Sequence, residues 1–142
     1  MNGRSQPTLA QLKLHTRAYY RRIGVVHCPI LGVDVHFTAE GYDHLINESN
    51  SKPGESKPRL ASEQYLKLVN LNNVKTVLTH SVLVKEVRTV KKNVKGKYKD
   101  AVLSEVVCNV KGSEISVIVE KVGLGNHKFL SVFPTKKPKN TH

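Results

Sequence analysis

The second half of the chain alternates apolar and polar residues in four successive segments, and this pattern most constrains the fold. The segments cover residues 82–90, 101–111, 114–121 and 127–133. Period-two alternation is typical of half-buried β-strands, and short connections join such strands antiparallel. Gly112-Ser113 is a candidate two-residue hairpin turn, and residues 123–126 form the next turn. The pattern therefore predicts an antiparallel meander of four strands.

The first half of the chain predicts helices. Residues 8–23 have helical spacing, and Thr8 with Gln11 forms a capping box. Short strands follow within 25–37. Thr38 can cap a second helix, and Ser62 a third stretch that runs to about residue 79 with a break near the asparagines at 70–73. We therefore expect one α+β domain over residues 1–142, with helices on one face of a four-stranded or slightly larger antiparallel sheet. Residues 1–7 and 135–142 are expected to be flexible tails.

The proposed turn assigns the residues to the two sheet faces. It pairs Lys111 with Glu114, and the next turn places Leu130 beside Val119 and, on the opposite face, Ser131 beside Ile118. The expected core face carries Val102, Val106, Cys108, Val110, Ile115, Val117, Val119, Leu130 and Val132. The other face mixes polar and large apolar residues: Glu105, Asn109, Ser116, Glu120, His127 and Ser131, with Leu103, Val107, Ile118, Phe129 and Phe133 between them. Such a face is either a ligand platform or an ordinary half-exposed face or dimer contact.

The charge predicts a polyanionic partner. The chain has 23 Lys and Arg against 11 Asp and Glu, a formal net charge of +12. A surplus of this size favours nucleic acid as the partner. The candidate phosphate contacts are the basic residues of the first helix, of the loop before Arg59 and of the expected loop 91–99: Lys13, Arg17, Arg21, Arg22, Lys57, Lys91, Lys92, Lys95 and Lys97. The sequence lacks metal-ligand spacing and a phosphate-cradling glycine motif, so we expect no metal and no cofactor. It also lacks a signal core or long apolar run, so we expect a cytoplasmic protein without membrane contact.

Two histidines are candidates for proton transfer. His44 lies four residues from both Glu40 and Glu48, whose carboxylates would favour a protonated imidazole. His127 begins the last strand, with Ser131 expected on the same side. Two imidazoles with nearby cations suit RNA self-cleavage, in which the 2′-hydroxyl of the substrate is the nucleophile. Arg59 is the best candidate for a phosphate clamp, because its planar fork binds two oxygens. The alternative is that His44 is a surface histidine in a charge ladder.

The segment His36-Phe-Thr-Ala-Glu-Gly-Tyr-Asp-His-Leu-Ile46 resembles the strand, helix and histidine of the barnase, EndoU, colicin and RelE-like nuclease superfamily, in its phage- and toxin-associated branches. Helices before a four-stranded sheet and hydroxyl residues on the last strand are similar too. The resemblance implies metal-independent cleavage of RNA, either tRNA or mRNA, by a toxin or mobile-element effector with an acidic antitoxin or immunity protein. His44 matches the helix histidine and Ser131 the hydroxyl position, while Arg59 matches the basic position only loosely. His127 has no firm counterpart, and the usual second histidine soon after the first is missing.

Three functions remain open at this point. The first is an endoribonuclease that leaves a 2′,3′-cyclic phosphate, with His44, His127, Arg59 and Ser131 as catalytic residues. The second is a non-catalytic RNA- or DNA-binding module that uses the same basic surface. The third is an inhibitor or adaptor that docks on an acidic protein.

Overall fold

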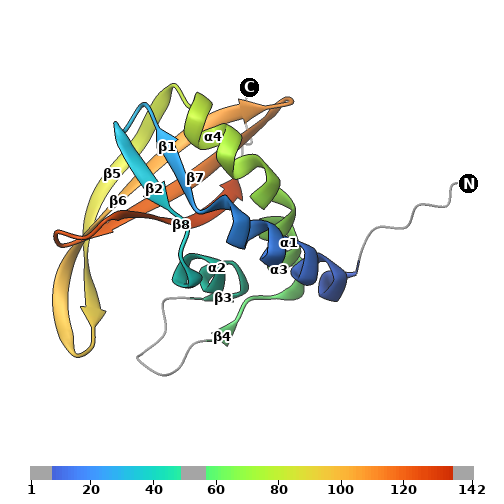
Figure 1. The fold of residues 1–142 in the computed structure, drawn as a ribbon, viewed down its shortest axis with the longest axis horizontal. Helices are drawn as coiled ribbons and strands as arrows, with labels where there is room; N and C mark the ends of the chain where they lie inside the picture. The colour runs from blue at the N-terminus through green and yellow to red at the C-terminus, as the bar shows by residue number, and fades with distance from the viewer. Residues whose placement is uncertain (1–7, 49–56, 136–142) are drawn as a thin grey trace, which may run out of the picture.

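The computed structural model describes residues 8–48 and 57–135, which form an α+β fold, as expected. A mixed six-stranded sheet carries helices against one face (Figure 1). The helices are α1 (Leu9–Ile23), α2 (Ala39–Ile46), α3 (Ala61–Asn70) and α4 (Val74–His80), with a 3-10 turn, η1 (Leu71–Asn73), between the last two. Within the described ranges, no helix combines the length and the apolar character that crossing a membrane requires.

The sheet has two strands beyond the predicted four-stranded meander and, contrary to the prediction, is not purely antiparallel. Its strands are β1 (Val25–Cys28), β2 (Val33–His36), β5 (Leu83–Val94), β6 (Lys97–Val110), β7 (Ser113–Val122) and β8 (His127–Pro134), in the order β1-β2-β8-β7-β6-β5. The meander β5 to β8 is antiparallel throughout, whereas β2 joins β8 in parallel. A separate two-stranded ladder pairs β3 (Asn47–Glu48) with β4 (Lys57–Pro58).

The expected loop at residues 91–99 is instead a hairpin. Pairing of β5 with β6 continues to Val94 and Lys97, and the Asn93 side chain accepts a 2.9 Å hydrogen bond from the Gly96 amide in the turn. The lysine-rich composition, which is unusual for strands, concealed this extension from pattern reading. Because pairing of β6 with β7 ends at Ala101 and Val122, the hairpin projects past the rest of the sheet (Figure 1). We call residues 91–100 the lysine arm.

The turn between β6 and β7 lies one residue earlier than predicted. Lys111-Gly112 occupies it with φ angles of 52° and 87°, so Val110 pairs with Ser113 and Val106 with Val117. Positive φ at both central positions is typical of the tight turn that suits the strand twist. Each β6 residue therefore pairs with the β7 residue two positions before the predicted partner. Because side chains alternate with a period of two, every side chain of β6 and β7 stays on its predicted face.

A bulge in β8 overturns the predicted assignment of its first half. Ser131 pairs with Ile118 as predicted, but Phe129, not Leu130, lies beside Val119. The extra residue reverses the alternation on one side of the bulge. Phe129 is therefore fully buried among the helices, where its ring stacks on Phe37 at 5.0 Å, and Leu130 is on the opposite face.

The core lies between the sheet and helices α1, α3 and α4. Helix α4 packs on β6, β1 and β7, α3 packs on β8, and α1 packs on α3. Its fully buried members come from both layers: Leu68, Leu71, Val74, Val77 and Leu78 from the helices, and Val106, Val117, Val119 and Val132 from the strands. The capping box at Thr8 and the break at 70–73 are confirmed, whereas the predicted cap at Ser62 is wrong because α3 already begins at Ala61.

Helix α2 packs unusually closely on β8, and Gly41 allows this. A Cβ atom at Gly41 would lie 2.6 Å from the carbonyl oxygen of Phe129 and would also collide with the Tyr20 hydroxyl. That hydroxyl donates a 2.6 Å hydrogen bond to the carbonyl of Thr38, the residue that caps α2. These contacts fix the position of His44, one turn further along the helix.

Candidate functional site

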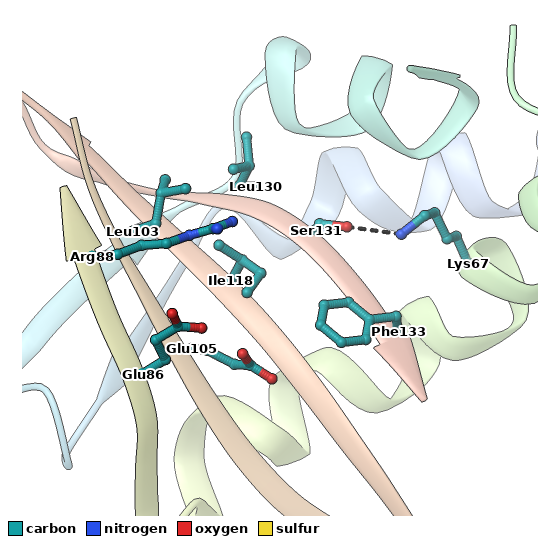
Figure 2. Close-up of a pocket in the computed structure, with 9 residues that line it drawn as sticks. All are labelled: Lys67, Glu86, Arg88, Leu103, Glu105, Ile118, Leu130, Ser131 and Phe133. Carbon is teal, nitrogen blue, oxygen red and sulfur yellow. Dashed lines mark hydrogen bonds between the residues drawn. The ribbon is translucent and has the colours of Figure 1, made fainter. Parts of the chain in front are cut away.

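The candidate site lies on the sheet face opposite the core, beside the free edge of β8. Strand β2 pairs with β8 only at His127 and Lys128, so among the described residues no strand lies beside the second half of β8 on that side. Helix α3 runs along this edge and contributes Lys67, which reaches β8 (Figure 2).

Two adjoining pockets form what we call the open-face groove. The first, about 320 Å³, is lined by Lys67, Glu86, Arg88, Leu103, Glu105, Ile118, Leu130, Ser131 and Phe133. The second, about 650 Å³, shares Lys67, Glu86, Glu105 and Phe133 and adds Arg59, Glu63, Leu66, Lys85, Pro134 and Thr135. The groove therefore joins residues of α3 to all four strands of the meander.

Lys67 is the cation most enclosed by this groove. Its Nζ donates hydrogen bonds to Ser131 Oγ at 2.9 Å and to the Val132 carbonyl at 3.2 Å, and it lies 5.6 Å from the centre of the Phe133 ring. Burial, together with the charge of Arg59, lowers the pKa of Lys67 to about 8. Its hydrogen-bond acceptors are neutral oxygens, and the charge of Glu63 offsets only part of the effect of burial, so an anion in the groove would be attracted to this ammonium group.

Arg59 links the groove to helix α2. Its Nε donates a 2.8 Å hydrogen bond to the His44 carbonyl, and its backbone amide donates a 2.8 Å bond to the Ile46 carbonyl. A cation at the carboxyl end of a helix is favourable, because the last carbonyls lack partners within the helix. The guanidinium group is thereby held between α2 and Lys67, at the mouth of the second pocket.

His44 is mostly enclosed, and its pKa contradicts the sequence-based expectation. The side chain is 15% exposed, and its Nε2 lies 4.0 Å from Glu40 Oε2. Burial lowers the pKa of His44, and the nearby Glu40 charge does not compensate for it. The imidazole is therefore neutral at pH 7 and able to accept a proton. The side chain of Glu48, the other expected partner, lies outside the described residues.

Glu40 stabilises a protonated His44 too weakly to offset burial, because two lysines already pair with this carboxylate. Lys92 lies 2.7 Å and Lys128 3.6 Å from its oxygens, and Lys92 also donates a 2.9 Å hydrogen bond to the buried Glu120. Burial alone would raise the pKa of Glu40, but the contacts with Lys92 outweigh burial and lower it. The same hydrogen bonds outweigh the burial of Lys92 and raise its pKa. We call Glu40, Lys92, Glu120 and Lys128 the ion network; it ties the lysine arm to α2.

His127 does not join the other predicted catalytic residues. It pairs with Lys121 and Val35 at the start of β8, two residues before Phe129 and on the same side of the strand. The bulge at Leu130 therefore directs it away from Ser131, contrary to the prediction that both share one side. Burial and then the Lys121 charge lower the pKa of His127.

The predicted phosphate contacts occupy two separate regions. Lys13 and Arg17 line a cavity of about 880 Å³ between α1 and α2, with the exposed Arg21 and Arg22 further along α1. The other region is the lysine arm, where Lys95 and Lys97 are exposed at the tip. Lys91 is 2.6 Å from Asp100, and Lys92 belongs to the ion network. The side chain of Lys57 lies outside the described part of the chain.

Sequence reasoning missed Lys67, Arg88 and Glu86 as site residues. A signal for Lys67 existed, because it lies three residues from Gln64 and four from Leu71, on the stripe that α3 buries. A lysine on a buried stripe needs a partner or a function. To place Arg88 and Glu86 in the groove, the register between β5 and β6 must be known. The predicted loop over residues 91–99 left that register unassigned.

Residues 8–48 and 57–135 contain no group of three or more His, Cys, Asp or Glu side chains arranged to hold a metal ion. The candidate ligand-binding features of the described residues are thus the groove and its cations, whereas His44 lines neither pocket and is tied to Arg59 through its backbone carbonyl. No known family model, curated protein or solved structure matches this chain.

Proposed function

We propose that the chain is a metal-independent endoribonuclease that cleaves RNA by acid–base chemistry and leaves a 2′,3′-cyclic phosphate. The observation that carries this proposal is the gathering of Arg59, Lys67 and Ser131 at one groove, with Arg59 bonded to the backbone carbonyl of the neutral His44. This reaction needs a proton acceptor and groups that bind the phosphate and stabilise its charge. His44 supplies the proton acceptor, and Arg59, Lys67 and Ser131 supply a guanidinium group, an ammonium group and a hydroxyl group.

In the proposed reaction, His44 takes the proton of the substrate 2′-hydroxyl. The 2′-oxygen then forms a bond to phosphorus, and the bond from phosphorus to the 5′-oxygen breaks. Arg59 and Lys67 stabilise the negative charge on the phosphoryl oxygens. With its pKa near 8, Lys67 is also acidic enough to donate a proton to the departing 5′-oxygen. Exchange with water then restores both groups.

The wider identity is part of the same proposal. The segment from His36 to Ile46 and the order of helices before the meander support membership of the barnase, EndoU, colicin and RelE-like superfamily, with β5 to β8 as its four-stranded sheet and β1 and β2 as additions. We infer that the protein is a toxin or mobile-element effector that acts on tRNA or mRNA in the cytoplasm. An acidic antitoxin or immunity protein would inhibit it. In this reaction His127 is not required.

The test is RNA cleavage in EDTA, with analysis of the product ends. We expect cyclic phosphate ends from the wild-type protein and a loss of about 10²- to 10⁴-fold in rate for His44→Ala. His27→Ala is the matched control, because His27 is an exposed histidine of β1 that pairs with Asp34 of β2. Cleavage that requires added divalent metal, or an unchanged rate for His44→Ala, would refute the proposal.

A second candidate is a non-catalytic RNA- or DNA-binding module, which the projecting lysine arm favours. Here affinity falls with salt, and each phosphate contact contributes about −0.7 to −0.9 to the logarithmic slope. Replacement of Lys95 and Lys97 by Gln is then expected to flatten the slope, whereas His44→Ala leaves binding intact. Binding without any cleavage by the wild-type protein would select this candidate over the enzyme.

A further inference from the structure

The first pocket of the open-face groove has an apolar floor and a polar rim. Side chains from three different strands make the floor: Leu103, Ile118, Leu130 and Phe133. Glu86, Glu105 and Arg88 stand around it, with Lys67 and Ser131 at the far side (Figure 2). A flat apolar surface bordered by hydrogen-bonding groups is suited to a planar ligand with polar edges.

The two carboxylates are placed where they are unfavourable for folding. Glu86 and Glu105 are directly opposite each other on neighbouring strands, and like charges in that position destabilise a sheet. The Glu105 side chain is 12% exposed, and Lys85 Nζ is 4.0 Å from its Oε2, which is too far for a hydrogen bond. These carboxylates would be better satisfied by a ligand that brings its own N–H donors.

Arg88 supplies donors to the same pocket. It is opposite Leu103, two residues from Glu86 on the same face of β5, and its side chain extends over the floor toward Leu130 (Figure 2). A guanidinium group donates two parallel hydrogen bonds to a pair of acceptors. The pocket therefore offers an acceptor pair from a carboxylate and a donor pair from Arg88 around one flat surface.

Among the four RNA bases, guanine complements this pocket best. Its N1–H and N2–H₂ groups are neighbouring donors, which suit one carboxylate, and its O6 and N7 are neighbouring acceptors, which suit an arginine. Adenine and cytosine place an acceptor beside their amino group, and uracil has one N–H between two carbonyls. We propose that the pocket binds a guanine base of single-stranded RNA, with the adjoining phosphate on Lys67 and Ser131. The inference rests on the proposed function, since it names the substrate of the same groove.

Binding of mononucleotides tests the inference separately from cleavage, because they contain no phosphodiester linkage. Titration calorimetry of the full chain in EDTA compares GMP, AMP, CMP and UMP. We expect GMP to bind ~10- to 100-fold more tightly than the others, which is the discrimination of one good bidentate contact. IMP lacks only the N2 amino group and is expected to bind between GMP and AMP.

Glu86→Gln and Glu105→Gln are expected to abolish the preference for GMP, whereas Glu114→Gln, on β7 outside the pocket lining, is expected to retain it. Glu86 is exposed, so E86Q tests the pocket even if E105Q fails to fold. Preference for GMP that persists in both variants would overturn the inference. If a wild-type protein that cleaves RNA binds all four nucleotides with affinities within about threefold of one another, the inference is also overturned. The proposed function would then stand. Selective GMP binding without cleavage would instead refute the nuclease and leave the pocket assigned.

Discussion

The depressed pKa of Lys67 predicts how stability depends on pH. In the folded chain this pKa is about 8, against an ordinary value of 10.5. Below pH 8 both states carry the charge, so pH has no effect through this group. Between pH 8 and 10.5 the unfolded chain retains a proton that the folded chain has lost, and the free energy of unfolding therefore rises with pH. The interval between the two pKa values corresponds to a gain of about 3 kcal/mol in the free energy of unfolding.

Lys67→Met isolates this contribution. The substitution removes the charge and keeps an apolar chain over the Phe133 ring. At pH 7 we expect a stability within ~1 kcal/mol of the wild type, since the relief of burying a charge offsets the loss of two hydrogen bonds. From pH 8 to 10.5 the wild type is expected to gain stability relative to the variant, by up to about 3 kcal/mol.

The measurement is urea unfolding, followed by circular dichroism, at several pH values from 7 to 10.5. Every other titratable group is common to both proteins, so its contribution cancels in the difference. Lys75→Met, at an exposed lysine of α4, is the matched control. Wild-type and Lys67→Met stabilities that stay parallel over the whole range would refute the account of Lys67 as an enclosed, under-compensated cation.

Three further predictions concern α2 and the ion network. Gly41→Ala is expected to destabilise the fold by ~1–3 kcal/mol in urea unfolding, because its Cβ would meet the Phe129 carbonyl; an unchanged midpoint would show that α2 does not pack so closely. Lys92→Met leaves the buried Glu120 without its cation, so a loss of ~3 kcal/mol is expected at pH 7 that shrinks when acid protonates the carboxylate; a loss independent of pH would contradict this. Because burial lowers the His44 pKa, cleavage rates in EDTA are expected to fall only below pH 6.5 on the acid side and above about pH 8 on the basic side, where Lys67 loses its proton; a basic limb unchanged in Lys67→Gln would exclude Lys67 as the acid.

The sequence predicted correctly those features that depend on residues within one helix, strand or turn. The helix that begins after Thr8, the four strands of the meander and the faces of β6 and β7 follow from local spacing, and the structure confirms them. Sequence reasoning named His44, Arg59 and Ser131 as catalytic candidates, and this role stays a prediction; in the structure Arg59 bonds the His44 carbonyl and lines a pocket with Lys67, which bonds Ser131. It was wrong about the β8 alternation, because a bulge carries no signal in period-two spacing.

The protonation states could not be read from the sequence. Spacing places Glu40 one helical turn from His44, which suggests a raised pKa for the imidazole. The structure reverses this, because burial of the imidazole lowers its pKa, and Lys92, which lies 52 residues from Glu40 in the sequence, pairs with the carboxylate. The lowered pKa of Lys67 likewise depends on the tertiary structure, because Lys67 is enclosed only where α3 packs beside β8.

What the sequence determined by itself is the set of elements, their capping and the surplus of positive charge, since each depends on residues close together in the chain. What only the tertiary structure decided is which charges meet, which of them water reaches, and which face of β8 each side chain occupies. Electrostatic energies depend on distance and burial in three dimensions, so neighbours in space, not in sequence, set the chemistry of this site.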